Sequence, residues 1–183
     1  MSLTLRALTI GGLIAVVLAL SACGDDKGNT ATTPAAAAPA ATTSTTPPGK
    51  TSSLDISTDL STKPTISKPS GDPPKKLVVM DVVDGKGRAA KAGDNVVVHY
   101  VGALYRTGKQ FEASWDSGKP FPFALGQGSV IPGWDQGVAG MKVGGRRLLI
   151  IPPDLAYGAQ GQGSIGPDET LIFVVDLLNT TPA

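Results

Sequence analysis

The sequence predicts an α+β domain made of several antiparallel strands and one short helix. Residues 146–151 and 170–178 are rich in Leu, Ile and Val, the composition of buried strands. Only residues 132–141 indicate a helix. A proline suits its first turn, and two glycines are expected to keep it short. The region that carries these patterns, residues 76–183, is large enough to bury one hydrophobic core.

The predicted elements follow one another with turn residues between them. A strand at residues 77–83 ends at a turn over residues 84–87, and a second strand spans residues 95–104. Thr107-Gly108 marks the next turn. Short strands are then expected at residues 110–113 and 121–125, ahead of the helix and the two long apolar strands.

Composition argues against several classes of function. The formal net charge is +1 and the pI is about 7.8, so no basic surface for nucleic acid is predicted. Cys23 is the single cysteine, which excludes an internal disulfide and a thiolate zinc cluster. His99 is the single histidine and is predicted to lie in a strand, which argues against a metal site or a Ser-His-Asp triad. We therefore expect neither a metal nor another cofactor.

Residues 1–22 are predicted to be a signal peptide. A weakly basic start at Arg6 precedes an apolar run at residues 7–20, which is short for a membrane-spanning helix and is followed by small residues. The sequence Leu20-Ser-Ala-Cys23 resembles the bacterial lipobox, in which the cysteine is lipidated and becomes the mature N-terminus. Lipidation at Cys23 would anchor the protein on the extracytoplasmic face of the cell membrane. The alternative is an ordinary signal peptide that leaves a free thiol.

Residues 23–75 are predicted to be a disordered tether. Thr, Ala, Pro and Ser dominate this stretch, as in residues 42–49. Such a segment has too little apolar surface to offset the entropy of ordering the chain. The tether would hold the domain off the membrane, and its threonines could carry O-glycans. A linker with no further role is the alternative.

Aromatic residues gather in one part of the chain. They make up only 5% of the sequence, and most lie between Tyr100 and Phe173. A small domain that concentrates aromatic side chains either packs them in its core or lines a cleft with them. Trp134 favours the cleft, because Pro132 and Gly133 place it at the start of the predicted helix.

Seven short motifs resemble those of the FKBP-type peptidyl-prolyl cis-trans isomerases. In chain order they are Val98-His-Tyr-Val-Gly, Gly108-Lys-Gln-Phe-Glu, Pro120-Phe-Pro-Phe-Ala-Leu-Gly, Val130-Ile-Pro-Gly-Trp, Gly137-Val-Ala-Gly-Met, Ala156-Tyr-Gly-Ala and Leu171-Ile-Phe-Val-Val-Asp-Leu-Leu. Each motif is weak alone, but their order and spacing are those of the family. The resemblance implies a curved antiparallel β-sheet of about five strands wrapped around one short α-helix. It also implies an enzyme that isomerises Xaa-Pro bonds, and the predicted signal peptide and lipobox add that these bonds lie in exported proteins.

The resemblance assigns a pocket to particular residues. It makes the Trp134 indole the floor beneath a proline ring, with phenylalanines as walls. It implies that the Tyr157 hydroxyl and the Ile131 backbone N–H each donate to a substrate carbonyl, and that Ile165 lies in an overhanging loop at residues 154–168. The implied catalytic residues are Tyr100, Phe111, Glu112, Tyr157 and Phe173, and the implied substrate-binding residues are Phe121, Val130, Ile131, Trp134 and Ile165.

Three positions depart from the family pattern. Glu112 stands where an aspartate is usual, Ser117 aligns with a common basic residue, and Gln162 aligns with a common histidine. The longer Glu112 side chain shifts the carboxylate, and a serine cannot form a guanidinium fork. These changes are either ordinary drift around an intact apolar floor or a cause of lower activity and macrolide affinity.

The resemblance also implies the partners. They are proline-containing segments of exported polypeptides and macrolides such as rapamycin and tacrolimus. Because Glu112 and Ser117 relax the polar part of the site, a second function is kept open. This alternative is a catalytically weak proline-binding or chaperone module on the same fold.

Overall fold

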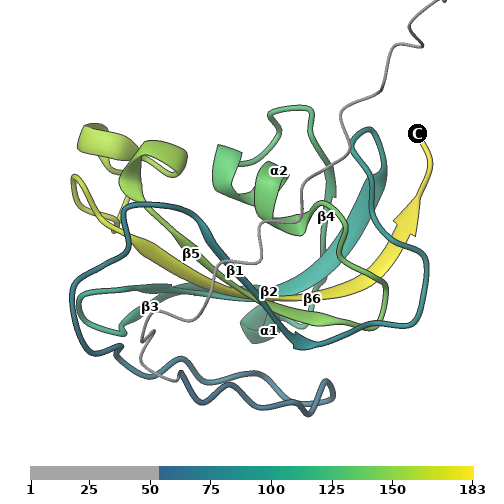
Figure 1. The fold of residues 1–183 in the computed structure, drawn as a ribbon, viewed down its shortest axis with the longest axis horizontal. Coiled ribbons are helices and arrows are strands. Elements are labelled where there is room, and N and C mark those ends of the chain that lie inside the picture. The colour runs from purple at the N-terminus through teal and green to yellow at the C-terminus, as the bar shows by residue number, and fades with distance from the viewer. Residues whose placement is uncertain (1–53) are drawn as a thin grey trace, which may run out of the picture. The chain divides into compact units, whose positions relative to one another are not determined.

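The structure is a computed structural model, and it describes residues 54–183. Six strands form one curved antiparallel sheet in the order β1-β5-β6-β2-β3, and β4 pairs with β2 off this path (Figure 1). The predicted fold class is therefore confirmed, with six strands where about five were expected. The strands are β1 (Val78–Val83), β2 (Asn95–Leu104), β3 (Gln110–Ala113), β4 (Phe121–Ala124), β5 (Arg146–Ile151) and β6 (Leu171–Thr181).

Helix α2 (Pro132–Val138) lies against one face of the sheet (Figure 1). As the sequence predicts, a proline occupies its first turn. Two helical glycines allow close packing on β5. A Cβ atom on Gly133 would lie 2.3 Å from Ile151 Cγ2, and one on Gly137 would lie 2.7 Å from Leu149 Cδ2. The glycines that weaken the helix are thus the residues that let it approach the sheet.

Arg147 of β5 fixes the C-terminal end of α2. Its guanidinium donates to the backbone carbonyls of Gly137 at 2.8 Å and Ala139 at 3.1 Å. The same group pairs with Asp81 of β1 at 2.6 Å. A cation at a helix C-terminus is favourable because the last carbonyls of the helix have no partner within it. This contact fixes how α2, and with it Trp134, lies over the sheet.

Three shorter helical turns were not predicted from the sequence. They are α1 (Ser114–Ser117), which follows β3 without a break, and the 3₁₀ turns η1 (Pro153–Leu155) and η2 (Gly158–Gln160). Elements of one turn are too short to show helical periodicity in the sequence. Within residues 54–183, no helix is long and apolar enough to cross a lipid bilayer.

The opposite face of the sheet is covered by residues 54–66, which we call the N-terminal strap. Leu54, Ile56 and Ile66 are buried there against side chains from β2, β5 and β6. The expectation that disorder continues to residue 75 is therefore corrected, because ordered packing begins by Leu54. Figure 1 shows this part of the chain on the side of the sheet away from α2. The predicted signal peptide, Cys23 and the tether up to residue 53 lie outside the described residues.

Arg146 of β5 holds the strap to the sheet. Its side chain is fully buried and pairs with Asp176 of β6 through two bonds of 2.5 and 2.8 Å. The remaining N–H groups donate to the strap carbonyls of Ser57, Asp59 and Thr62, at 2.7 to 3.1 Å. All five N–H donors of the guanidinium are thus used. Because a buried charge without partners is costly, Arg146 ties the strap to the fold.

Candidate active site

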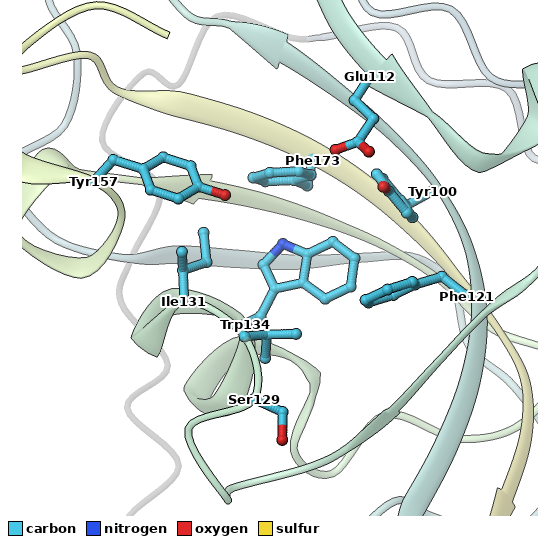
Figure 2. Close-up of a pocket in the computed structure, with 9 residues that line it drawn as sticks. Tyr100, Glu112, Phe121, Ser129, Ile131, Trp134, Tyr157 and Phe173 are labelled. Carbon is cyan, nitrogen blue, oxygen red and sulfur yellow. The ribbon is translucent and has the colours of Figure 1, made fainter. Parts of the chain in front are cut away.

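A pocket of about 180 Å³ lies on the α2 side of the sheet (Figure 2). β2, β3, β4 and β6 each contribute one side chain to it, and α2, the residues just before α2, and the segment between η1 and η2 supply the rest. Its lining consists of Tyr100, Glu112, Phe121, Ser129, Val130, Ile131, Trp134, Tyr157 and Phe173.

Trp134 forms the floor of this pocket. The indole is only 4% exposed, and three rings stand nearly perpendicular to it. Its ring centroid lies 5.1 Å from that of Tyr100 at 85° and 5.2 Å from that of Phe173 at 90°. Phe121 stands 6.2 Å away at 83° and is more than a third exposed, so it forms the outer wall. Edge-to-face contacts of this kind are favourable and fix ring orientations, which makes the pocket rigid.

The chain just before α2 is positioned by hydrogen bonds to the helix. The Trp134 backbone N–H donates to the Ile131 carbonyl at 2.9 Å. The Asp135 carboxylate accepts from the backbone N–H groups of Gly126 at 2.8 Å and Gly128 at 3.0 Å. The loop between β4 and α2 is therefore tied to the helix that carries the pocket floor, so Ser129, Val130 and Ile131 keep their place in its wall.

Two phenolic hydroxyls and one carboxylate supply most of the polar character. Burial raises the pKa of Tyr100 far above its usual value, and the nearby Glu112 carboxylate raises it further. Burial also raises the pKa of Tyr157, with the charge of Glu112 as the second cause. Both hydroxyls therefore stay protonated at neutral pH and can donate hydrogen bonds.

The indole N–H of Trp134 is a third donor inside the pocket. It is buried and has no hydrogen-bond partner within residues 54–183. Figure 2 shows it pointing from the floor toward the side of Tyr157 and Phe173. An apolar cleft with a few convergent donors suits a small apolar ring flanked by carbonyl groups.

Comparison with known proteins identifies the family to which this pocket belongs. Residues 86–178 match the model of the FKBP-type peptidyl-prolyl cis-trans isomerases. The chain belongs to this family. It is 57% identical over 118 residues to an FK506-binding protein of Streptomyces anulatus, a match that covers 63% of this chain and 95% of that protein. It is 46% identical over 117 residues to a probable FK506-binding protein of Corynebacterium glutamicum, covering 64% of this chain and 98% of that protein.

A solved structure supports the same assignment. The crystal structure of AtFKBP13 superposes with a TM-score of 0.55 and 40% sequence identity, over 60% of this chain and 96% of that chain. The FKBP resemblance drawn from the seven motifs is therefore confirmed at the level of family and fold. The chain is an FKBP-type peptidyl-prolyl cis-trans isomerase.

The FKBP pocket contains most of the residues that the sequence assigned to it. Eight of the ten line it, and the two others lie nearby. Phe111 stands outside the lining and packs edge-on against Phe173, with centroids 5.6 Å apart. Ile165 is buried in the same core cluster as Trp134 and Phe173, and its backbone pairs with Gln162 in a tight turn. Phe111 therefore supports the Phe173 wall, and neither Phe111 nor Ile165 lines the cavity.

The sequence analysis missed one residue that lines the FKBP pocket and one that lies behind its wall. Ser129 lines it, next to the predicted Val130. Gly102 of β2 lies under two of the rings: a Cβ atom there would be 2.7 Å from Phe111 Cζ and 2.8 Å from Phe173 Cε1. Only its place two residues after Tyr100, on the same face of the strand, could have indicated it.

Ser117 takes no part in the polar rim of the FKBP pocket. Its hydroxyl donates to the Ser114 carbonyl at 3.0 Å and accepts from the Lys119 backbone N–H at 3.3 Å. It thereby closes the single turn of α1. Consequently the Glu112 carboxylate has no basic neighbour at the position where the family pattern places one.

Proposed function

We propose that this pocket catalyses rotation of Xaa-Pro bonds by desolvation and by fit to the rotated proline ring. The observation that carries the proposal is the buried Trp134 floor with Tyr100, Phe121 and Phe173 standing perpendicular around it. Such a surface matches the flat, apolar face of a pyrrolidine ring. The residues proposed to act on the substrate are the eight assigned from the sequence that line the pocket. Phe111 and Ile165 are proposed to pack behind them and hold them in place.

The chemistry needs no nucleophile. Resonance gives the amide a rotation barrier of about 18–20 kcal/mol, so uncatalysed prolyl isomerisation takes about 10–100 s. The twisted transition state has lost this resonance and carries less charge separation than the planar amide. A dry apolar pocket therefore favours the twisted state over the ground state. For a turnover of about 10–10³ s⁻¹, the pocket has to supply about 4–7 kcal/mol.

The donors of the pocket complete the mechanism. The Tyr157 hydroxyl and the Ile131 backbone N–H are proposed to hold the carbonyl groups on either side of the rotating bond. Figure 2 shows the Tyr157 hydroxyl directed toward the space above the Trp134 indole. These bonds position the peptide so that its Xaa-Pro bond lies in the apolar pocket when it rotates.

We predict that soluble residues 54–183 isomerise a Leu-Pro test peptide and that Tyr157→Phe lowers kcat/KM about two- to tenfold. The phenylalanine keeps the ring but removes a hydrogen bond of about 0.5–1.5 kcal/mol. A protease-coupled or NMR exchange assay measures the rate, and Tyr105→Phe, whose hydroxyl donates to Asp72 away from the pocket, is the matched control. A folded domain that binds tacrolimus but turns over no peptide would instead establish the alternative, a proline-binding or chaperone module.

The substrates are proposed to be proline-containing segments of exported polypeptides, with tacrolimus and rapamycin as macrolide ligands. Two relatives are named for binding FK506, and they match this chain over nearly their whole length. Export is proposed from the signal-peptide pattern at residues 1–22 and the lipobox-like sequence ending at Cys23. The enzyme would then work on the extracytoplasmic face of the cell membrane, held there by a lipid anchor.

The anchor is tested by changing Cys23. We expect Cys23→Ser to shift the full-length protein from the membrane fraction to the soluble fraction, because the acyl chains that hold it to the bilayer can no longer be attached. Immunoblots of the two fractions measure the shift, with Ser21→Ala as a neighbouring control that keeps the cysteine. A Cys23→Ser protein that stays with the membrane after a high-salt wash would contradict lipid anchoring.

A further inference from the structure

We propose that Glu112 gives this pocket a preference for prolines that have a lysine or arginine next to them in the chain. The inference rests on the proposed isomerase site and names the substrate class that this site favours. It follows from the position of Glu112, from the lack of a cation beside it, and from the reach of its charge across the pocket.

Glu112 is the one charged side chain among the nine that line the pocket. It lies on β3, which ends the path of the sheet, and it is exposed to solvent. Figure 2 shows its carboxylate directed toward the Tyr100 hydroxyl, whose pKa it helps to raise. The other lining residues are apolar apart from hydroxyl groups and the indole N–H. The rim of the pocket thus carries a single negative charge.

No lysine or arginine in residues 54–183 neutralises this charge. The five ion pairs of this region use the carboxylates of other residues, and Glu112 forms none of them. Those carboxylates belong to Asp81, Asp84, Asp94, Asp116 and Asp176. Ser117, at the position where a basic residue is common in the family, hydrogen-bonds within α1 instead. A cation brought by a ligand is therefore free to pair with Glu112.

The charge of Glu112 acts on both sides of the pocket. It contributes to the raised pKa of Tyr100 on β2 and to that of Tyr157 on the opposite wall. A field that stabilises the protonated phenols also stabilises a positive ligand group placed near them. Because Glu112 is exposed to solvent, dissolved salt weakens this effect.

The shape of the pocket brings flanking side chains to this rim. A proline ring seated on Trp134 leaves the residues before and after it to cross the pocket mouth. Lysine and arginine carry their charge on a long flexible stem that can lie along the apolar Phe121 edge. From either flank such a side chain can reach the Glu112 carboxylate, whereas an acidic side chain there is repelled.

The test compares peptides that differ at one flank of the proline. Lysine, leucine and glutamate are placed in turn before the proline in one series and after it in another, and kcat/KM is measured for each. The wild-type 54–183 protein is compared with Glu112→Gln. We expect Glu112→Gln to lower the Lys-to-Leu ratio about two- to fivefold in at least one series and to raise the Glu-to-Leu ratio. The difference should shrink in high salt.

The controls separate the charge from its position. Glu112→Asp keeps the charge and should keep the preference, while Asp84→Asn removes one carboxylate outside the pocket and should leave the ratios unchanged. The inference is overturned if the Lys-to-Leu and Glu-to-Leu ratios of kcat/KM are the same for wild type and Glu112→Gln in both series. The proposed function still stands in that case, provided that the wild-type protein turns over the Leu-Pro peptide. If no peptide is turned over, the same ratios are measured as binding affinities by Trp134 fluorescence in a Trp115→Phe background, and they decide the question.

Discussion

Replacing Arg146 with methionine is expected to lower the free energy of unfolding of residues 54–183 by about 3–5 kcal/mol. The change leaves the buried Asp176 carboxylate without its partner. It also removes the three hydrogen bonds to the strap carbonyls of Ser57, Asp59 and Thr62. Breaking a buried ion pair from one side is far costlier than losing one at the surface, because the remaining charge stays desolvated.

Urea unfolding followed by circular dichroism measures this loss. Lys63→Ala is the matched control, because it removes an ion pair with Asp116 that lies at the surface, and we expect it to cost less than about 1 kcal/mol. A protein that begins at residue 76 should lose stability as well, since the side chains that Leu54, Ile56 and Ile66 cover become exposed. An Arg146→Met protein as stable as the Lys63→Ala control would show that the strap is not tied to the fold by this arginine.

The strap explains why the sequence could not predict where order begins. Its apolar anchors are three residues spread over a segment dominated by polar side chains, a composition that is typical of disorder. The groups that bind Arg146 are backbone carbonyls, which every residue has and no composition reveals. The strap also lies outside residues 86–178, where the family model matches. Tertiary contacts, and not local sequence, decide the order of this segment.

The strands and the pocket floor, in contrast, could be predicted. β5 and β6 are runs of branched apolar residues bounded by turns, so their type and approximate bounds follow from the sequence alone. Trp134 was placed by the proline that begins α2. Phe111 and Ile165 were assigned to the pocket but do not line it, because whether an apolar side chain faces a cavity or packs into the core depends on tertiary packing. For Gly102 the sequence offered only its place two residues after Tyr100, because a glycine acts here by leaving space for the Phe111 and Phe173 rings.

Gly102→Ala is expected to lower kcat/KM for a Leu-Pro peptide at least about tenfold while the domain stays folded. A methyl group at this position would lie 2.7 Å from Phe111 Cζ and 2.8 Å from Phe173 Cε1, closer than carbon atoms approach one another. The two rings would have to move, and Phe173 is the wall that stands at 90° to the Trp134 floor. Overpacking of this kind costs about 1–3 kcal/mol. Displacing a positioned group by about 1 Å can cost about a hundredfold in rate.

Two measurements distinguish a deformed pocket from an unfolded protein. Urea unfolding should give a single cooperative transition that is lowered by no more than the overpacking cost. Tacrolimus binding, followed by Trp134 fluorescence in a Trp115→Phe background, should weaken in parallel with kcat/KM, because ligand and substrate use the same wall. Adding Phe111→Leu to Gly102→Ala should restore part of the binding, since the shorter side chain leaves room for the methyl group and for Phe173. Full activity in the Gly102→Ala protein would mean that the Phe173 wall does not set the rate, and the desolvation mechanism would then have to rest on Trp134 and the remaining rings alone.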